Sequence, residues 1–189
     1  IDALKAGSIQ WQSAFAQLLG GTVYAGETQL KLDQDNHALV DVQGLQLHNA
    51  MQLYPTEGLA GTGLIDGTIP LQISLNGISV EKGQLMAREP GNLQFRSDAL
   101  TNLARSNPAM QLLSQAMSDF NYTLLSSELD FEKDGKLKLN IRLHGSNPEV
   151  EKGRPIHLNF NLEENLYALL TSIQLNNHVS ETIIERIRQ

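Results

Sequence analysis

The chain has no cysteine among its 189 residues, which excludes disulfides, thiolate nucleophiles and sulfur-ligated metal sites together. Aromatic residues make up only 5% of it, so any apolar surface must be mainly aliphatic. No apolar run reaches the length of a membrane-spanning helix, and no signal peptide is recognisable. Because the first residue is Ile1, we expect a mature protein or, more readily, an excised fragment of a longer one.

Basic residues are also scarce, with 14 Lys and Arg against 21 Asp and Glu, and a net charge of −7. Proteins that bind nucleic acid usually concentrate basic side chains on one face, where they neutralise phosphates. The densest basic stretch here, residues 133–142, is interleaved with acidic residues and is typical of the solvated face of a hairpin. We therefore expect no nucleic-acid partner.

Common catalytic and cofactor motifs are absent from the sequence. In the run Gly61–Gly67 the third glycine comes one residue late for a dinucleotide fingerprint, and no helix is expected directly after it. The five histidines show no metal-ligand spacing, although His144 and His157 could be neighbours across the last hairpin. The prediction is a protein that is not an enzyme and that uses neither a cofactor nor a metal.

What the chain does contain is a repeated alternation of aliphatic and polar residues. It is clearest in 69–75, 137–143 and 156–162, and a period of two is typical of a strand with one buried and one solvated face. The pair Asp134-Gly135 between two such runs predicts a hairpin. Further strands are expected at 6–12, 22–24, 28–32, 38–47 and 122–133, with three or four more in the glycine-punctuated stretch 59–96, while 14–19 could be helix or strand.

Helices are expected in fewer places. A short one at 49–53 ends before Pro55, and two more cover 98–105 and 108–120, the latter with Asn107 as its cap. Two further helical segments are expected at 165–174 and 179–188. The apolar stripe of the 108–120 helix, which should lie on the sheet, consists of Leu112, Leu113, Ala116, Met117 and Phe120.

These elements predict a mainly β fold with accessory helices, in the α+β class, whose largely antiparallel sheet curls into an open groove or taco-like half-barrel. Helices could cover the apolar face as an ordinary core. However, the few amphipathic helices cannot cover at least six strands that each have an aliphatic face. This favours a partly uncovered apolar face that binds a ligand or partner. A single domain is expected over 1–189, with glycine-punctuated strands (1–96), a helical insert (97–120), further strands (121–163) and C-terminal helices (164–189).

Three motifs lie close together in the glycine-punctuated stretch. They are Gly61, Gly63 and Gly67 followed by Pro70-Leu71, then Gly83 with Leu85, and then Pro90-Gly91 with Leu93. With the closing segment 158–170, they resemble the C-terminal region of the YdbH family, within the AsmA-like superfamily of bacterial envelope proteins. The resemblance covers most of the chain.

This resemblance implies a protein anchored in the inner membrane of a Gram-negative bacterium. Such a protein would cross the periplasm as a β-sheet groove that carries phospholipids between the inner and outer membranes. The chain would be its distal piece, facing the outer membrane. The expected partner is a small outer-membrane lipoprotein (YnbE-like), which would dock by β-strand addition to an unpaired sheet edge.

Aliphatic side chains with few polar interruptions suit the acyl chains of phospholipids, since burying each methylene gains about 0.8 kcal/mol. The alternative function is a scaffold or docking domain that transports nothing, with a closed core and an edge strand that recruits a partner. The residues expected to line the lipid groove are Ile69, Leu71, Ile73, Leu75, Val80, Leu137, Leu139, Ile141, Leu143, Ile156, Leu158 and Phe160.

Overall fold

The computed structural model describes residues 7–11, 13–31, 34–53 and 56–167. Most of these residues are in strands, which confirms the expected mainly β fold. The elements, in chain order, are β1 (Ser8–Trp11), β2 (Ala14–Leu18), β3 (Gly21–Ala25), β4 (Thr28–Lys31), β5 (Asn36–Gln46), α2 (Leu47–Gln52), β6 (Leu59–Gly61), β7 (Leu64–Ser74), β8 (Gly77–Ala87), β9 (Gly91–Phe95), α3 (Asp98–Ala104), α4 (Pro108–Met117), β10 (Phe120–Phe131), β11 (Lys136–Ser146) and β12 (Ile156–Asn165).

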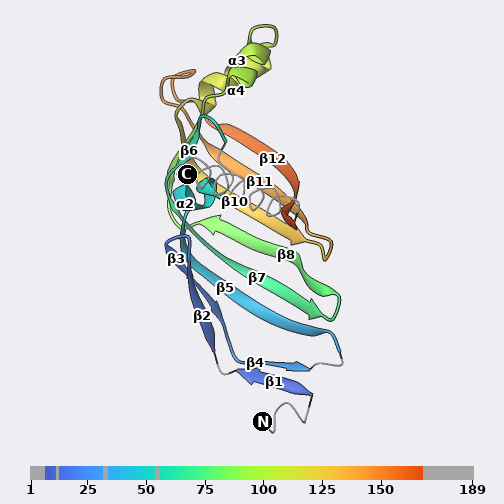
Figure 1. Cartoon of the computed structure of the whole chain (residues 1–189). Coiled ribbons are helices and arrows are strands. Elements are labelled where there is room, and N and C mark those ends of the chain that lie inside the picture. The colour runs from blue at the N-terminus through green and yellow to red at the C-terminus, as the bar shows by residue number, and fades with distance from the viewer. Residues whose placement is uncertain (1–6, 12, 32–33, 54–55, 168–189) are drawn as a thin grey trace, which may run out of the picture.

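One long antiparallel sheet organises the fold. Its strands follow the order β12-β11-β10-β8-β7-β5-β3-β2, and β1 pairs with β4 in a separate two-stranded sheet. Strand β9 pairs with the start of β10, and β6 pairs with β9, so these two short strands branch away from the main path. Figure 1 shows that the sheet is elongated and curled, with β12 towards one end and β1 and β4 at the other.

The curl has identifiable local causes in the strand register. Strand β8 has an extra residue between Val80 and Gln84 relative to its partner β7, and Lys82 within it adopts a φ of 56°. This extra residue also shifts the register of β8 against β10, and one further extra residue occurs in each of β5 and β10. Since such bulges bend a strand and increase its twist, their repetition curls the sheet into the expected half-barrel.

The predicted turns and caps are confirmed where the structure describes them. The Asp134-Gly135 hairpin is closed by the Glu132 N–H, which donates to the Lys136 carbonyl at 2.8 Å. The Asn107 side chain accepts from the backbone N–H of Ala109 at 3.0 Å and caps α4. The ambiguous stretch 14–19 forms strand β2, and the expected helix at 179–188 lies outside the described residues.

Three residues are placed differently from the prediction. Phe120 is the first residue of β10 rather than the end of a helix, because α4 ends at Met117 and both elements bury side chains in one cluster. Leu75 is in a two-residue turn that pairs Ser74 with Gly77, and it is 86% exposed. Asn165, expected to begin a helix, still belongs to β12 because it pairs with Lys136.

Candidate functional site

The strand register places aliphatic side chains on one face of the sheet. One row of directly paired residues crosses five neighbouring strands. Because paired residues point to the same side of a sheet, the row fixes one common apolar face, which we call the inner face. The residues of this row, from β5 to β11, are Ala38, Leu71, Val80, Phe131 and Leu137.

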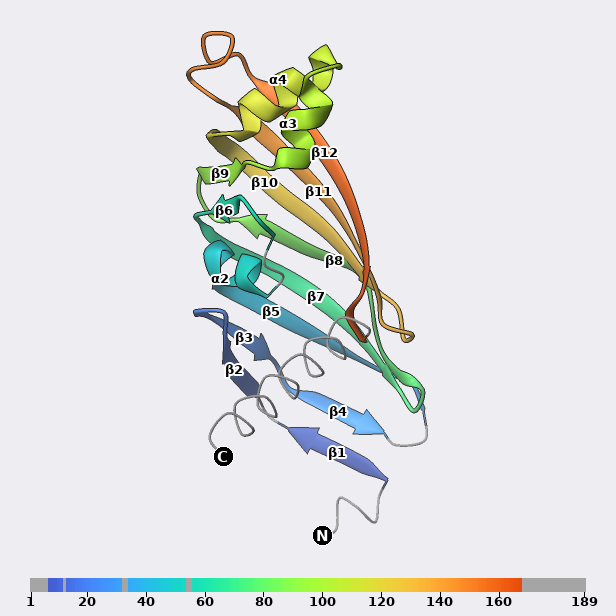
Figure 2. The same cartoon turned by 45° about the horizontal axis from the view of Figure 1, so that its top comes forward.

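The inner face is the face towards which the sheet curls. Helix α2 packs on it, since Leu47 and Met51 contact the hydrophobic core cluster, and Figure 2 shows α2 within the curve of the sheet. The face continues onto β3 and β2, where Val42 pairs with Val23 and Val23 with Ala16. An aliphatic surface therefore runs across all eight strands of the main path.

Part of the inner face is closed by short elements that fold over it. The side chains of Leu93, Ala116, Met117, Phe120, Tyr122 and Leu143 form a buried core cluster. These residues come from β9, α4 and the ends of β10 and β11 nearest to them. We call this region, together with α2 and β6, the capped half of the inner face.

Five of the twelve predicted lining residues belong to the capped half. Leu143 is part of the core cluster and is only 3% exposed. The other four are half-buried side chains that pack against it: Ile141, Ile156, Leu158 and Phe160. Their surroundings are those of a protein core, so their contact with lipid stays a prediction.

Six others lie outside the core cluster. Val80 is 8% exposed beside its partner Leu71, while the remaining five are half-buried. With Leu129 and Phe131, we call them the hairpin half, since most lie towards the turns at 75–76 and 132–135. They are Ile69, Leu71, Ile73, Val80, Leu137 and Leu139. The twelfth residue, Leu75, is exposed in the first of these turns.

Several inner-face residues were not among the predicted lining. On β5, Val40 pairs with Ile69, and on β12, Leu162 pairs with Leu139 and is 43% exposed. A signal was present, because the same alternation occurs in 38–42 and 125–131. Strand pairing, rather than the strength of each local pattern, assigns these residues to the face.

The glycine motif surrounds one buried tyrosine of the capped half. Tyr122 is 1% exposed, and its hydroxyl donates a hydrogen bond to the Thr62 carbonyl at 2.8 Å. A Cβ atom on either Gly63 or Gly91 would collide with this hydroxyl. Burial also raises the pKa of Tyr122. These two glycines therefore make room for a tyrosine that ties β10 to the turn between β6 and β7.

The opposite, outer face is more polar, although Phe15, Leu39 and Met86 are exposed on it. One ion pair on this face spans three strands. The Arg88 guanidinium donates to both carboxylate oxygens of Asp66, at 2.8 and 2.6 Å. The backbone N–H of Gly44, at the β5 bulge, donates to Asp66 at 2.8 Å. Hydrogen bonding to Arg88 lowers the pKa of Asp66 and outweighs the opposing effect of burial. The arrangement joins β5, β7 and the end of β8.

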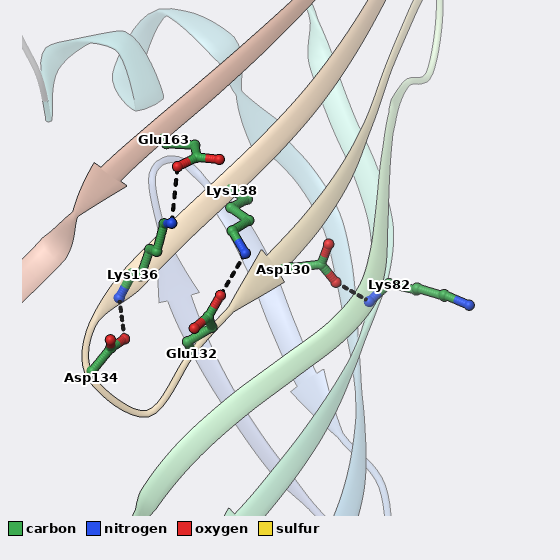
Figure 3. Close-up of polar contacts among 7 residues, drawn as sticks. All are labelled: Lys82, Asp130, Glu132, Asp134, Lys136, Lys138 and Glu163. Atoms are coloured by element: carbon green, nitrogen blue, oxygen red, sulfur yellow. Dashed lines mark hydrogen bonds and ion pairs between the residues drawn. The ribbon is translucent and has the colours of Figure 1, made fainter.

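A second group of polar contacts lies near the β10–β11 turn, as Figure 3 shows. Lys138 pairs with Glu132 at 2.6 Å, and Lys136 pairs with Glu163 of β12 at 3.0 Å. Hydrogen bonding to Glu132 raises the pKa of Lys138, and hydrogen bonding to Lys136 lowers that of Glu163. The expected alternation of lysines with acidic residues is thus a set of solvated pairs.

The expected neighbours His144 and His157 are directly paired across β11 and β12, with stacked rings whose centroids are 4.0 Å apart. Within the described ranges, no group of three or more His, Asp or Glu residues is placed to hold a metal ion. Strand β12 pairs with β11 along one side, and none of the described strands pairs with its other edge.

Among the helices that the structure describes, none is both long enough and apolar enough to cross a membrane. The chain is 20% identical over 171 residues to the protein named "Probable phospholipid transport protein YdbH" of Escherichia coli (strain K12). That alignment covers 90% of this chain but 19% of the relative, so the chain spans about a fifth of the relative's length. No solved structure matches the chain.

A model of the family described as "YdbH-like: Intermembrane phospholipid transport protein YdbH" matches residues 2–188. The match covers nearly the whole chain and agrees with the curled, mainly β architecture. It also includes the glycine motifs around Tyr122. The chain belongs to the YdbH-like family.

Proposed function

We propose that this chain guides phospholipids between the inner and outer membranes, with their acyl chains on the inner face of its curled sheet. One observation carries the proposal, namely that aliphatic side chains continue across eight adjacent strands on the inner face, whereas apolar residues on the outer face are interrupted by polar and charged ones. Eight strands about 4.8 Å apart make a strip roughly 35 Å long. A lipid on this strip would keep its tails on the aliphatic surface and its headgroup at the solvated rim.

The wider setting is part of the same proposal. The family description and the name of the relative both refer to phospholipid transport, and the chain corresponds to a fifth of that relative. We infer that it is the distal part of a longer periplasmic protein whose anchor lies in the inner membrane. No catalytic step is required, because movement along an apolar strip needs only exchange between equivalent contacts.

A docking role at the edge of the sheet accompanies the transport role. Residues 156–164 of β12 contain no proline, so every second residue, whose backbone N–H and C=O point away from β11, offers a donor as well as an acceptor at the free edge. Their inner-face side chains, such as Leu158 and Leu162, would extend the aliphatic surface onto an added strand. We propose that a small outer-membrane lipoprotein adds a strand at this edge.

Photo-crosslinking from paired positions tests the transport role. A benzoylphenylalanine at Leu139 or Ile73 is expected to crosslink phospholipid in bacterial envelopes, because both residues lie on the inner face outside the core cluster. The matched control positions are on the outer face: Asn140 directly follows Leu139, and Gln72 directly precedes Ile73. Equal lipid crosslinking at inner and outer positions, or none at the inner ones, would contradict lipid guidance.

A second row of residues tests the docking role. Glu128, Asn140 and Asn161 are paired in register across β10, β11 and β12, all on the outer face. A crosslinker at Asn161, on the edge strand, is expected to capture the lipoprotein, whereas one at Glu128 should not. Capture from Glu128 but not from Asn161 would place the partner away from the β12 edge.

The alternative function, docking without transport, is favoured by the closed packing of the capped half. The substitution Leu139→Asp separates the two functions, because Leu139 lies outside the core cluster. If the chain transports lipid, this variant loses lipid crosslinking from Ile73 and keeps lipoprotein capture from Asn161. If the chain only docks, both signals are unchanged from those of the parent chain.

A further inference from the structure

The helical hairpin formed by α3 and α4 differs in charge from the rest of the molecule. Charged residues make up 19% of the chain, but Arg105 is the only one between residues 99 and 118. Asp98 and Asp119 lie just outside these limits. The only acidic side chain of the hairpin is therefore Asp98, the first residue of α3, and none lies between it and the end of α4, although the whole chain has a net charge of −7.

The root of the hairpin is fixed firmly to the sheet. Ala116 is fully buried, and Asn147, only 2% exposed, donates to the carbonyls of Gln115 and Ala116 at 3.0 and 3.4 Å. The Arg96 guanidinium donates to the Ser118 carbonyl at 3.1 Å. The carbonyls at the end of α4 thus accept hydrogen bonds from Asn147, which follows β11, and from Arg96, which follows β9. These bonds fix the direction in which the hairpin leaves the sheet.

The tip of the hairpin, in contrast, projects into solvent. Helix α3 has no buried residue, and Leu103 is 58% exposed next to the turn that contains Arg105. Figures 1 and 2 both show the hairpin at the end of the sheet opposite β1 and β4, and in Figure 1 it projects beyond β12. It therefore lies at one end of the aliphatic strip.

We propose that the α3–α4 hairpin is a membrane contact, with its tip inserted at the headgroup level of a phospholipid surface. The inference deepens the proposed function and rests on it, since a lipid path must meet a membrane at its end. A chain with a net charge of −7 is repelled by an anionic lipid surface, so it must approach through a part without acidic residues. An exposed leucine next to a single arginine suits the boundary between acyl chains and phosphates.

Because the chain lacks cysteine, single-cysteine variants of the whole chain can report insertion directly. Leu103→Cys is labelled with the environment-sensitive dye NBD and mixed with vesicles of phosphatidylethanolamine and phosphatidylglycerol at 3:1. We expect a blue shift and a several-fold rise in emission. The matched control is Leu39→Cys, because Leu39 is 56% exposed on the outer face of β5 and its dye should not respond.

Vesicle sedimentation gives an independent measurement. Leu103→Asp is expected to lower the vesicle partition constant roughly tenfold. This is the effect of moving one leucine side chain from an apolar site to water. Leu39→Asp should leave it within twofold. Circular dichroism of both variants should match that of the parent chain, since both side chains are exposed.

Three outcomes would overturn the proposal. They are equal dye responses at the two positions, no response at Leu103, and a response that depends on protein concentration in the absence of vesicles, which would show self-association. The transport proposal is tested separately, by lipid crosslinking from Leu139 and Ile73. An absence of that crosslinking would contradict transport whatever the dye at the hairpin reports. If lipid crosslinks form at Leu139 and Ile73 but the dye at Leu103 does not respond to vesicles, the membrane contact is contradicted and the transport proposal is not.

Discussion

The capped half and the hairpin half of the inner face have the same alternation of residues but different surroundings. In the capped half, Phe120 and Ala116 are fully buried by α4 and β9. In the hairpin half, Leu139 pairs with Leu162, which is 43% exposed. Alternation thus specifies which side of a strand is apolar, whereas the elements that fold over that side decide whether it becomes core or binding surface.

Truncation of one apolar side chain in each half gives the largest expected difference between them. Phe120→Ala leaves a cavity in the core cluster and should lower the free energy of unfolding by about 3–5 kcal/mol. Leu139→Ala removes a half-buried side chain and should lower it by about 1 kcal/mol. Urea unfolding of both variants measures the difference. Equal losses would mean that the two halves are packed alike.

Gly63 gives the next largest effect, because its neighbour Tyr122 belongs to the capped half. Gly63 has a φ of 135°, and a Cβ there would meet the Tyr122 hydroxyl. Gly63→Ala is expected to cost about 3 kcal/mol through backbone strain and this collision. In a Tyr122→Phe background the collision is removed while the strain remains, so the additional loss from Gly63→Ala should be smaller. A strictly additive double variant would disprove the link between the two residues.

The sequence alone predicted most of the fold, because its signals are local. Alternation and turn residues identified nearly every described strand, and the Asn107 cap placed the start of α4. The inner face followed from the same alternation, as the register of Ala38, Leu71 and Val80 confirms. These features depend on neighbouring residues, which determine strand faces and helix ends through backbone geometry.

The capped half could not be predicted, because it depends on contacts between distant residues. Tyr122 is hydrogen-bonded to Thr62, 60 residues away along the chain, and nothing next to Gly63 or Gly91 in the sequence indicates the side chain for which they make room. Short elements such as β6 and α2 have weak local patterns, and nothing in them indicates which part of a sheet they cover. Hence the packing of Leu143 in this core and of Ile156 against it was not foreseen, while their contact with lipid stays a prediction.

Removal of Asn147 tests how the capped half supports the projecting hairpin. Its buried amide donates to Gln115 and Ala116 at the end of α4, so Asn147→Ala should cost about 2 kcal/mol by leaving these carbonyls unsatisfied. Hydrogen exchange is expected to increase within 108–118 more than in β11. Asn147→Asp retains the acceptor for Glu149 but loses the donor, and it should be at least as destabilising. Uniform exchange across the chain would contradict a local role.

Two of the outer-face ion pairs extend the comparison to pH, with the smallest expected effect. Hydrogen bonding to Arg88 lowers the pKa of Asp66 from its ordinary value of 3.8, so the pair stabilises the fold above that value and loses its contribution as the pH falls through the lower folded pKa. Since Asp66 is 34% exposed, Asp66→Asn should cost less than about 1 kcal/mol at pH 7. The difference from the parent chain should shrink below about pH 4. The control is Glu132→Gln at the solvated Lys138 pair near the β10–β11 turn, where high salt should abolish any loss. Because Asp66→Asn keeps an oxygen that can accept from the Gly44 N–H, its loss should also fall in high salt. Asp66→Ala removes this acceptor as well and should keep part of its loss in high salt; equal salt sensitivity of the two Asp66 variants would show that the backbone bond adds nothing.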